Sequence, residues 1–346
     1  MTIRTLVCGA ALLSFGPAAP DPVSPNLSAV FGQVGLTPEQ RADVDAGRPA
    51  AKVVPWGGPS EVHVFGAIHI DGSPETYLKL ARDVSRLGAT PGYLAIGDLP
   101  ASVSSSDLGG LTVDPDDLKA LKDCRDGNCD VQLPTDSITA FHDAVDWSQP
   151  DVSGQVNGLA RGMVLNLVHE YRRGGNTALG VYRDKQHPAR VAEQFETMVG
   201  RSTVLPDAMP ELRQYLLKYP DVDLPGGDSF FYWEKVNFGM KPTIRVNHGV
   251  VYRSGDARSG MSAVAIKQLY ASHYFHTALD VSVCVPDVPR GGFYLLTLKS
   301  SEQDGLTGAK GSILRKVVVD KTRSSLEKAL ATIKETVEKT AHKKEK

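Results

Sequence analysis

Two parts of the chain carry the patterns of apolar and polar residues that are typical of β-strands. The first is the segment EVHVFGAIHI at positions 61–70. The second follows Gly227, where turn residues separate five segments: FFYWEKV, TIRVNHGVVYR, SAVAIKQLYASHYF, ALDVSVCV and GFYLLTLKS. Short strands at regular spacing, with turn residues between them, predict an antiparallel meander.

A helical pattern lies between these two parts. From about 135 to 222, apolar residues recur at three- and four-residue spacing, and Gly or Pro ends each run. This spacing predicts an inserted helical section. A last helix is predicted from Ser312, with one apolar stripe made of Ile313, Val317, Leu326, Leu330, Ile333 and Val337. Because such a stripe needs a surface on which to be buried, the predicted fold class is α+β, with the C-terminal helix lying on the sheet.

The first 25 residues have the layout of a secretory signal peptide. One arginine precedes an apolar run from Thr5 to Gly16, and small residues and prolines follow the run. The run is too short to span a bilayer, and no transmembrane span is expected in the mature chain. We therefore expect an exported protein, periplasmic or extracellular, with one domain at 59–340. The lead-in at 26–58 is expected to be extended, with one short helical piece at TPEQRADVDAG.

The cysteines fit an oxidising compartment. Cys124 and Cys129 flank the turn-forming sequence RDGN, so a hairpin would bring the two thiols within bonding range. In an exported protein such a pair is more often a disulfide than a redox centre, and we predict a Cys124–Cys129 disulfide. Cys284 lies within VSVCVP and is expected to be a buried free thiol.

Composition and motifs exclude several functional classes. The 346 residues carry a net charge of −2 and no basic stripe apart from the last few residues, which argues against a nucleic-acid binder. The chain has no G-x-S-x-G elbow, P-loop, dinucleotide fingerprint, H-E-x-x-H or C-x-x-C-H motif, so no cofactor is predicted. His169-Glu170 lacks a second histidine four residues on and is not interpreted as a zinc site.

The stretch IKQLYASHYFH at 266–276 is the most suggestive sequence in the chain. We interpret it as a strand, because its neighbours are β-branched and alternate. Strand alternation would send His273 and His276 to opposite faces and would place Tyr270, Tyr274 and His276 together. A metal bound by His248, His273 and His276 is the alternative, but pocket wall is the favoured interpretation and no metal site is predicted.

Candidate wall residues come from several of the predicted strands. Aromatic and histidine side chains offer contact area together with a few polar groups, as a site for an amphipathic molecule requires. The candidates are Tyr232, His248, Tyr252, Tyr270, Tyr274 and His276. Glu234, beside Tyr232 and Trp233, is a further candidate as a buried acid, although a solvent-facing carboxylate is the commoner case.

The C-terminal third resembles the START and polyketide-cyclase-like superfamily, whose helix-grip fold holds a long last helix against a curved antiparallel sheet. The matching features are the strand GFYLLTLKS, the loop DGLTGAKG and the amphipathic helix from Ser312, and EVHVFGAIHI with the helix after it is similar to the family's beginning. The helical section at 135–222 is longer than that family's connecting helices. The resemblance implies a cavity between helix and sheet for lipid, sterol or polyketide-like molecules, sometimes with cyclase chemistry.

Three functions are compatible with these observations. The leading hypothesis is an exported protein that binds an apolar or amphipathic, lipid-like small molecule in a helix-grip cavity. The first alternative is a pocket enzyme of cyclase or hydrolase type that uses His276 or Glu234 for acid–base chemistry. The second alternative is a structural envelope protein whose sheet is packed shut and has no cavity.

Overall fold

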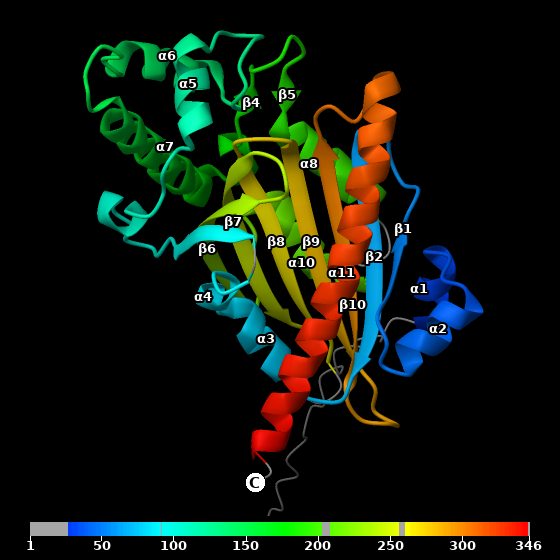
Figure 1. Cartoon of the computed structure of the whole chain (residues 1–346). Coiled ribbons are helices and arrows are strands. Elements are labelled where there is room, and N and C mark those ends of the chain that lie inside the picture. Colours follow the sequence, from blue (N-terminus) through cyan, green and yellow to red (C-terminus); the bar gives the residue numbers. More distant parts are fainter. Residues whose placement is uncertain (1–26, 91, 203–207, 256–259, 345–346) are drawn as a thin grey trace, which may run out of the picture.

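One curved, eight-stranded antiparallel sheet organises the protein. The computed structural model describes residues 27–90, 92–202, 208–255 and 260–344. The strand order is β1-β2-β10-β9-β8-β7-β6-β3, so β6 to β10 form the predicted meander (Figure 1). The strands are β1 (Ala50–Val53), β2 (Glu61–Ile70), β3 (Tyr93–Asp98), β6 (Gly227–Asn237), β7 (Pro242–Arg253), β8 (Ser262–Ala271), β9 (Phe275–Pro286) and β10 (Phe293–Gln303).

Helices cover both faces of this sheet. Figure 1 shows α11 crossing one face, with α8 and α10 behind the other. We call these the α11 face and the α8 face. The α11 face carries α3 (Pro74–Arg82), α4 (Val84–Leu87) and α11 (Gly308–Lys344). The α8 face carries α1 (Leu27–Gln33), α2 (Pro38–Asp45), α8 (Val191–Arg201) and α10 (Pro210–Lys218).

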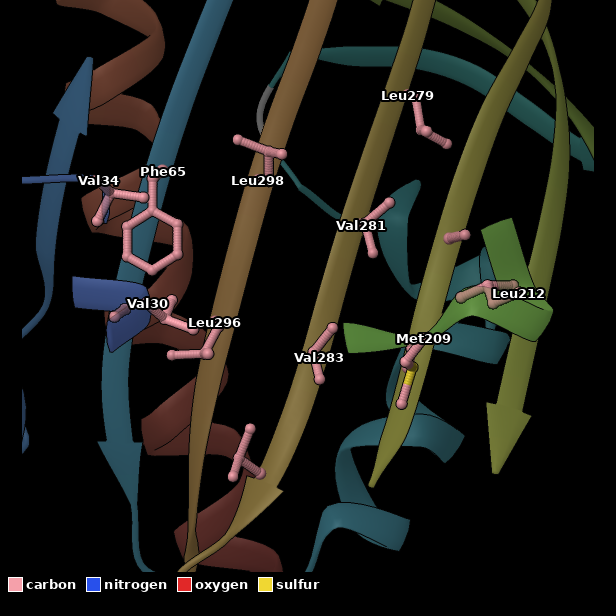
Figure 2. Packing of buried hydrophobic residues seen from close by; sticks show 14 of the residues in the cluster. Val30, Val34, Phe65, Met209, Leu212, Leu279, Val281, Val283, Leu296 and Leu298 are labelled. Atoms are coloured by element: carbon pink, nitrogen blue, oxygen red, sulfur yellow. The ribbon is translucent and has the colours of Figure 1, made fainter. Parts of the chain in front are cut away.

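The core on the α8 face explains why the strands are apolar at alternate positions. Val281, Val283, Leu296 and Leu298 point from β9 and β10 towards the helices, and Phe65 does so from β2 (Figure 2). Alternate residues of the same strands point to the α11 face, because side chains of a strand alternate between its two sides. Both faces are covered, so β2 is buried at all ten positions.

Helix α11 packs directly on β2. A Cβ atom on Gly66 would lie 2.7 Å from Leu326 and 2.9 Å from Leu330, so only glycine allows this close approach. Leu326, Leu330 and Val337 of the predicted stripe are buried. The stripe prediction is wrong for the first half of the helix, because Ile313 is 73% and Val317 46% exposed. The helix buries its apolar side only from its middle onwards.

The helices predicted between 135 and 222 are present, but they do not form one unit, because α8 and α10 pack on the α8 face. The others, together with residues before 135, form a separate layer at one end of the sheet, which we call the helical insertion. It contains α5 (Pro115–Asp123), α6 (Thr135–Ala144) and α7 (Val152–Gly174), preceded by the 3-10 helix η1 (Ser105–Leu108). The 3-10 helix η2 (Gly175–Ala178) and the short strands β4 (Val181–Tyr182) and β5 (Ala189–Arg190) follow α7. The Cys124–Cys129 disulfide fastens the loop after α5, with 4.5 Å between the two Cα atoms, and Cys284 is a buried free thiol.

The N-terminal part differs from the expected extended lead-in. Residues 27–53 form α1, α2 and β1, and β1 pairs with β2 along the edge of the sheet. Val30 and Phe31 of α1 enter the core of the α8 face, so hydrophobic burial holds this segment in place. The predicted signal peptide at 1–25 lies outside the described residues. Within the part of the chain that is described, no helix is long and apolar enough to cross a membrane.

Candidate functional site

A cavity of about 640 Å³ lies between α11 and the sheet. It opens where the first half of α11 leaves the sheet, and we call it the α11 cavity. The helix contributes Leu314, Val317, Val318 and Ser325 among others, and the β6–β7 connection contributes Phe238 and Met240. This volume falls within the range of about 300–1,000 Å³ that is usual for small-molecule sites.

The wall of the α11 cavity is largely apolar. The rings of Phe238 and Phe275 meet edge to face with 5.3 Å between centroids, which closes one side. Leu314, Val317 and Met240 line the cavity and are also exposed to solvent. Exposed apolar side chains at the rim of an apolar cavity would be covered by a bound apolar molecule, which offers a reason for their exposure.

The floor of the cavity, by contrast, is charged. Arg245 on β7 lines the cavity, and its Nη1 lies 3.0 Å from Oε1 of the buried Glu234 on β6. The Nε of Arg245 also donates to Oε1 of Gln268, at 3.1 Å. Burial raises the pKa of Glu234, although the neighbouring Arg245 favours the carboxylate. Glu234 is therefore a buried acid, one of the two possibilities considered from the sequence. Arg245 lines the cavity and Glu234 does not, so Glu234 is connected to the cavity only through its ion pair with Arg245.

A second ion pair extends the charged floor. Lys299 of β10 and Asp280 of β9 line the cavity and contact each other, because these two residues are direct partners across the strands. Lys321 of α11 lines the cavity as well. The charged lining residues are thus three cations, Arg245, Lys299 and Lys321, and one anion, Asp280. Because Glu234 neutralises Arg245 from behind and Asp280 neutralises Lys299, the net excess is the single positive charge of Lys321, which favours a negatively charged group in the bound molecule.

Two tyrosines add polar groups to the wall. Burial raises the pKa of Tyr93, and the nearby Glu234 raises it further, so its hydroxyl stays protonated and can donate a hydrogen bond. Tyr274 also lines the cavity, and its hydroxyl accepts a hydrogen bond from the backbone N–H of Lys241 at 2.9 Å. Both hydroxyls could orient a polar group of a ligand.

The stretch 266–276 is not the single strand that its pattern predicted. Strand β8 ends at Ala271, a tight turn covers 272–274, and β9 begins at Phe275. Tyr274 occupies the turn with φ of +65°, a left-handed conformation. A bulge also interrupts β8, because Val246 pairs with Tyr270 while the adjacent Asn247 pairs with Gln268. Strict alternation therefore fails twice. Tyr274 lines the α11 cavity, whereas Tyr270 and His276 both pack edge to face on the ring of Tyr182, with 6.1 and 6.3 Å between centroids.

The structure separates the six predicted wall residues. Tyr274 lines the α11 cavity, whereas Tyr270 lines a different cavity beneath the insertion, where its hydroxyl donates to the carbonyl of Gln132. Tyr232 is buried on the α11 face, where its ring stacks on Phe230 at 6.0 Å. Tyr252 belongs to the core of the α8 face. A role in binding remains a prediction for each of them.

The two histidines predicted as wall residues differ in burial, because His248 lies in the core and His276 is half-buried. His248 is fully buried and stacks on Phe231 at 4.5 Å, and its two nitrogens lie within hydrogen-bond distance of Tyr171 and Ser229. Burial lowers the pKa of His248 well below its usual value, so the ring is neutral. His248 is thus a buried, hydrogen-bonded histidine of the core.

Nor do the three histidines considered for a metal site converge. His273 lies 2.8 Å from the carboxylate of Asp117, and His276 faces Gln194 at 3.5 Å, while His248 has the partners given above. Within the described residues, no group of three or more histidine, cysteine, aspartate and glutamate side chains is placed to hold a metal ion.

Two buried polar groups had no signal in the sequence. Ser300, His63 and Glu61 form a hydrogen-bonded chain, with 2.9 Å from Ser300 Oγ to His63 Nδ1 and 3.0 Å from His63 Nε2 to Glu61 Oε2. The chain resembles a catalytic triad in composition. Ser300 is among the lining residues of the α11 cavity, but its hydroxyl contacts His63 and Ser202 on the α8 face. Alternation along β2 places Glu61 and His63 on one face, whereas only the pairing of β2 with β10 brings Ser300 to them, so no local pattern could reveal the full set.

Lys267 is the second such group. It is fully buried on the α8 face, with its Nζ 4.0 Å from the ring centroid of Phe195 and bonded to Asn176 and to the carbonyl of Leu216. Burial lowers the pKa of Lys267 well below its usual value. The apolar residues on either side of Lys267 indicate a buried strand, but a lysine side chain is itself rarely buried, so the sequence did not predict a core position for it.

Comparisons with known proteins add no family to this description. No protein-family model matches the chain, and no curated protein sequence matches it.

Proposed function

We propose that this chain is an exported protein that binds an apolar or amphipathic, lipid-like small molecule in the α11 cavity. The observation that carries the proposal is a cavity of about 640 Å³ with an apolar wall and a charged floor. A long helix over a curved sheet also fits the proposed helix-grip relationship. The disulfide and the apolar run at the N-terminus support the exported part of the proposal.

The charges narrow the class of ligand. Two of the three lining cations, Arg245 and Lys299, have acidic partners, so an anionic polar group would be attracted chiefly to Lys321. An apolar tail would cover the exposed side chains of Leu314, Val317 and Met240. A long-chain carboxylic acid has both features.

A pocket enzyme is supported less well. Its specific support is Glu234, whose pKa is raised by burial as a general acid requires. However, Glu234 is paired with Arg245, and the ion pair would have to open before the carboxyl group could reach a ligand. The volume of the cavity argues against a purely structural role with a closed sheet.

The test is a titration of the purified, delipidated chain with the fluorescent fatty acid cis-parinaric acid. We expect saturable binding to a single site. Ser325 lines the cavity from an exposed position on α11, so Ser325→Trp should block the cavity without disturbing the core. Affinity in this variant should fall by at least about tenfold, since most of the apolar contact would be lost.

Lys328→Trp is the matched control. Lys328 is exposed on the same helix and does not line the cavity. Its replacement should leave the affinity unchanged. Equal loss in both variants, or no saturable binding by the unaltered chain, would overturn the proposal.

A further inference from the structure

A second cavity, of about 490 Å³, lies beneath the helical insertion, and we call it the insertion cavity. Helices α5, α6 and α7 and the end of the sheet line it. Most of its wall is apolar, including Leu121, Leu133, Phe141, Met163 and Val164. It is large enough for a small ligand, and it shares no lining residue with the α11 cavity.

One buried carboxylate lines this apolar space. Asp117 of α5 is only 4% exposed. Its Oδ2 lies 2.8 Å from Nε2 of His273, which fixes the carboxylate in place. Its Oδ1 is buried and accepts no hydrogen bond. A buried acceptor without a donor costs free energy, and a ligand that supplied the donor would recover it.

The nearest cation does not fill this role. Nζ of Lys241 lies 3.8 Å from Asp117 Oδ1 and 3.6 Å from Asp130 Oδ2, both beyond hydrogen-bond distance. Lys241 is partly exposed and does not line the cavity. If a ligand formed a hydrogen bond to Oδ1 of Asp117, Lys241 would still have Asp130 as an ion-pair partner.

The other charged groups of the cavity are also acidic. Asp136 and Glu170 line it at more exposed positions than Asp117, and none of the described lining residues is lysine, arginine or histidine. Glu170 has a cation outside the cavity, Arg173, at 3.3 Å. The sign of this lining is opposite to that of the α11 cavity, so the two cavities select different ligands.

We propose that the insertion cavity binds an apolar primary amine, whose ammonium group donates a hydrogen bond to Oδ1 of Asp117. The alkyl or aryl part of the amine lies among the apolar side chains of the two helices, such as Phe141 of α6 and Met163 and Val164 of α7. The more exposed Asp136 and Glu170 attract the cation to the mouth. This site is independent of the proposed fatty-acid site.

The test is a calorimetric titration of the full chain with octylamine, octanol and octanoate, which have the same tail and differ in the polar group. Octylamine should bind saturably. Octanol should bind at least about tenfold more weakly and octanoate most weakly, because neither can form the charge-assisted hydrogen bond that the ammonium group donates to the buried carboxylate. Asp117→Asn keeps the shape of the side chain. It should weaken octylamine by about tenfold and leave octanol unchanged.

Two variants on α7 locate the binding. Ala160 lines the cavity, and Ala160→Phe should abolish octylamine binding by filling it, whereas His169→Phe at an exposed position outside the lining should not. Ser325→Trp, which blocks the α11 cavity, should leave octylamine binding intact. Comparable affinities for octylamine and octanol, or an unchanged octylamine affinity in either Asp117→Asn or Ala160→Phe, would overturn the proposal. If Asp117→Asn does not fold, the proposal is tested by the affinities of the three ligands and by the comparison of Ala160→Phe with His169→Phe.

Discussion

The guanidinium of Arg245 lies 3.0 Å from the carboxylate of Glu234, and the two residues face each other across neighbouring strands at the floor of the α11 cavity. Glu234 is 2% exposed, so it has little water to solvate its charge. Arg245 therefore compensates the buried charge of Glu234, so that charged groups can lie at the floor of a cavity whose wall is otherwise apolar.

Replacing one member of this pair should be strongly destabilising. Arg245→Met leaves a buried carboxylate without its cation and should lower the free energy of unfolding by about 3–5 kcal/mol. The double variant Arg245→Met, Glu234→Leu should lose much less, because no uncompensated charge remains. Urea unfolding measures both. If the double variant loses as much stability as Arg245→Met and Glu234→Leu lose together when each is made alone, the pair is not coupled.

Helix α11 should stabilise the protein through its second half only. Leu330 is 1% exposed and packs over Gly66, so Leu330→Ala should cost about 2–5 kcal/mol. Ile313 was assigned to the same stripe from the sequence but is exposed, so Ile313→Ala should change stability by less than about 0.5 kcal/mol. Thermal unfolding of the two variants compares them directly. Similar losses would mean that the whole stripe is buried in solution.

The disulfide should be present in protein prepared under oxidising conditions. Thiol labelling of the denatured, unreduced chain should modify Cys284 and leave Cys124 and Cys129 unmodified. Because the loop between them is short, the double Cys124→Ser, Cys129→Ser variant should lose about 2 kcal/mol in stability. Labelling of Cys124 and Cys129 in the unreduced chain would rule out the bond.

Asp184 should make the insertion less stable at neutral pH than in mild acid. Burial raises the pKa of Asp184 to about 6, from about 4 in an unfolded chain. The folded state therefore binds a proton that the unfolded state releases between these two values, and this contribution to stability falls as the pH rises from 4 to 6. Asp184→Asn should stabilise the protein at pH 7 by on the order of 2 kcal/mol.

The difference in stability between the Asp184→Asn variant and the unaltered protein should vanish below about pH 4, where both side chains are neutral. Unfolding curves collected from pH 4 to pH 8 give this difference directly and cancel the titration of other groups. A difference that is independent of pH, or one that grows in acid, would contradict the assignment.

Local patterns predicted most of the fold. Residues 61–70 form β2 with the predicted bounds, and the five later segments lie in β6 to β10, because alternation and turn residues are local signals. The stretch 266–276 failed for a local reason as well, since no glycine or proline marks the turn at Ser272–Tyr274 and Tyr274 itself adopts the positive φ. In the lead-in, the predicted short helical piece is α2, but α1 and β1 were not predicted, because prolines and glycines concealed a short strand that depends on β2 for its partner.

The candidate site was less predictable than the fold. The Arg245–Glu234 pair depends on the register of β6 against β7, and Lys299–Asp280 depends on that of β9 against β10. Neither register can be read from one strand alone. Of the four tyrosines chosen from the sequence, Tyr232 and Tyr252 are buried in the cores and Tyr270 and Tyr274 line cavities, because tyrosine serves packing as readily as binding.

The central claim is that the α11 cavity holds the ligand, and photolabelling with a diazirine-bearing fatty acid tests it most directly. Peptide mapping of the labelled full chain should place the label on the first half of α11, around Val317 to Ser325, and on β10 near Lys299 to Gln303. An excess of unlabelled fatty acid should suppress this labelling. Label confined to the peptides of α5 to α7, or label that unlabelled fatty acid does not displace, would contradict the account.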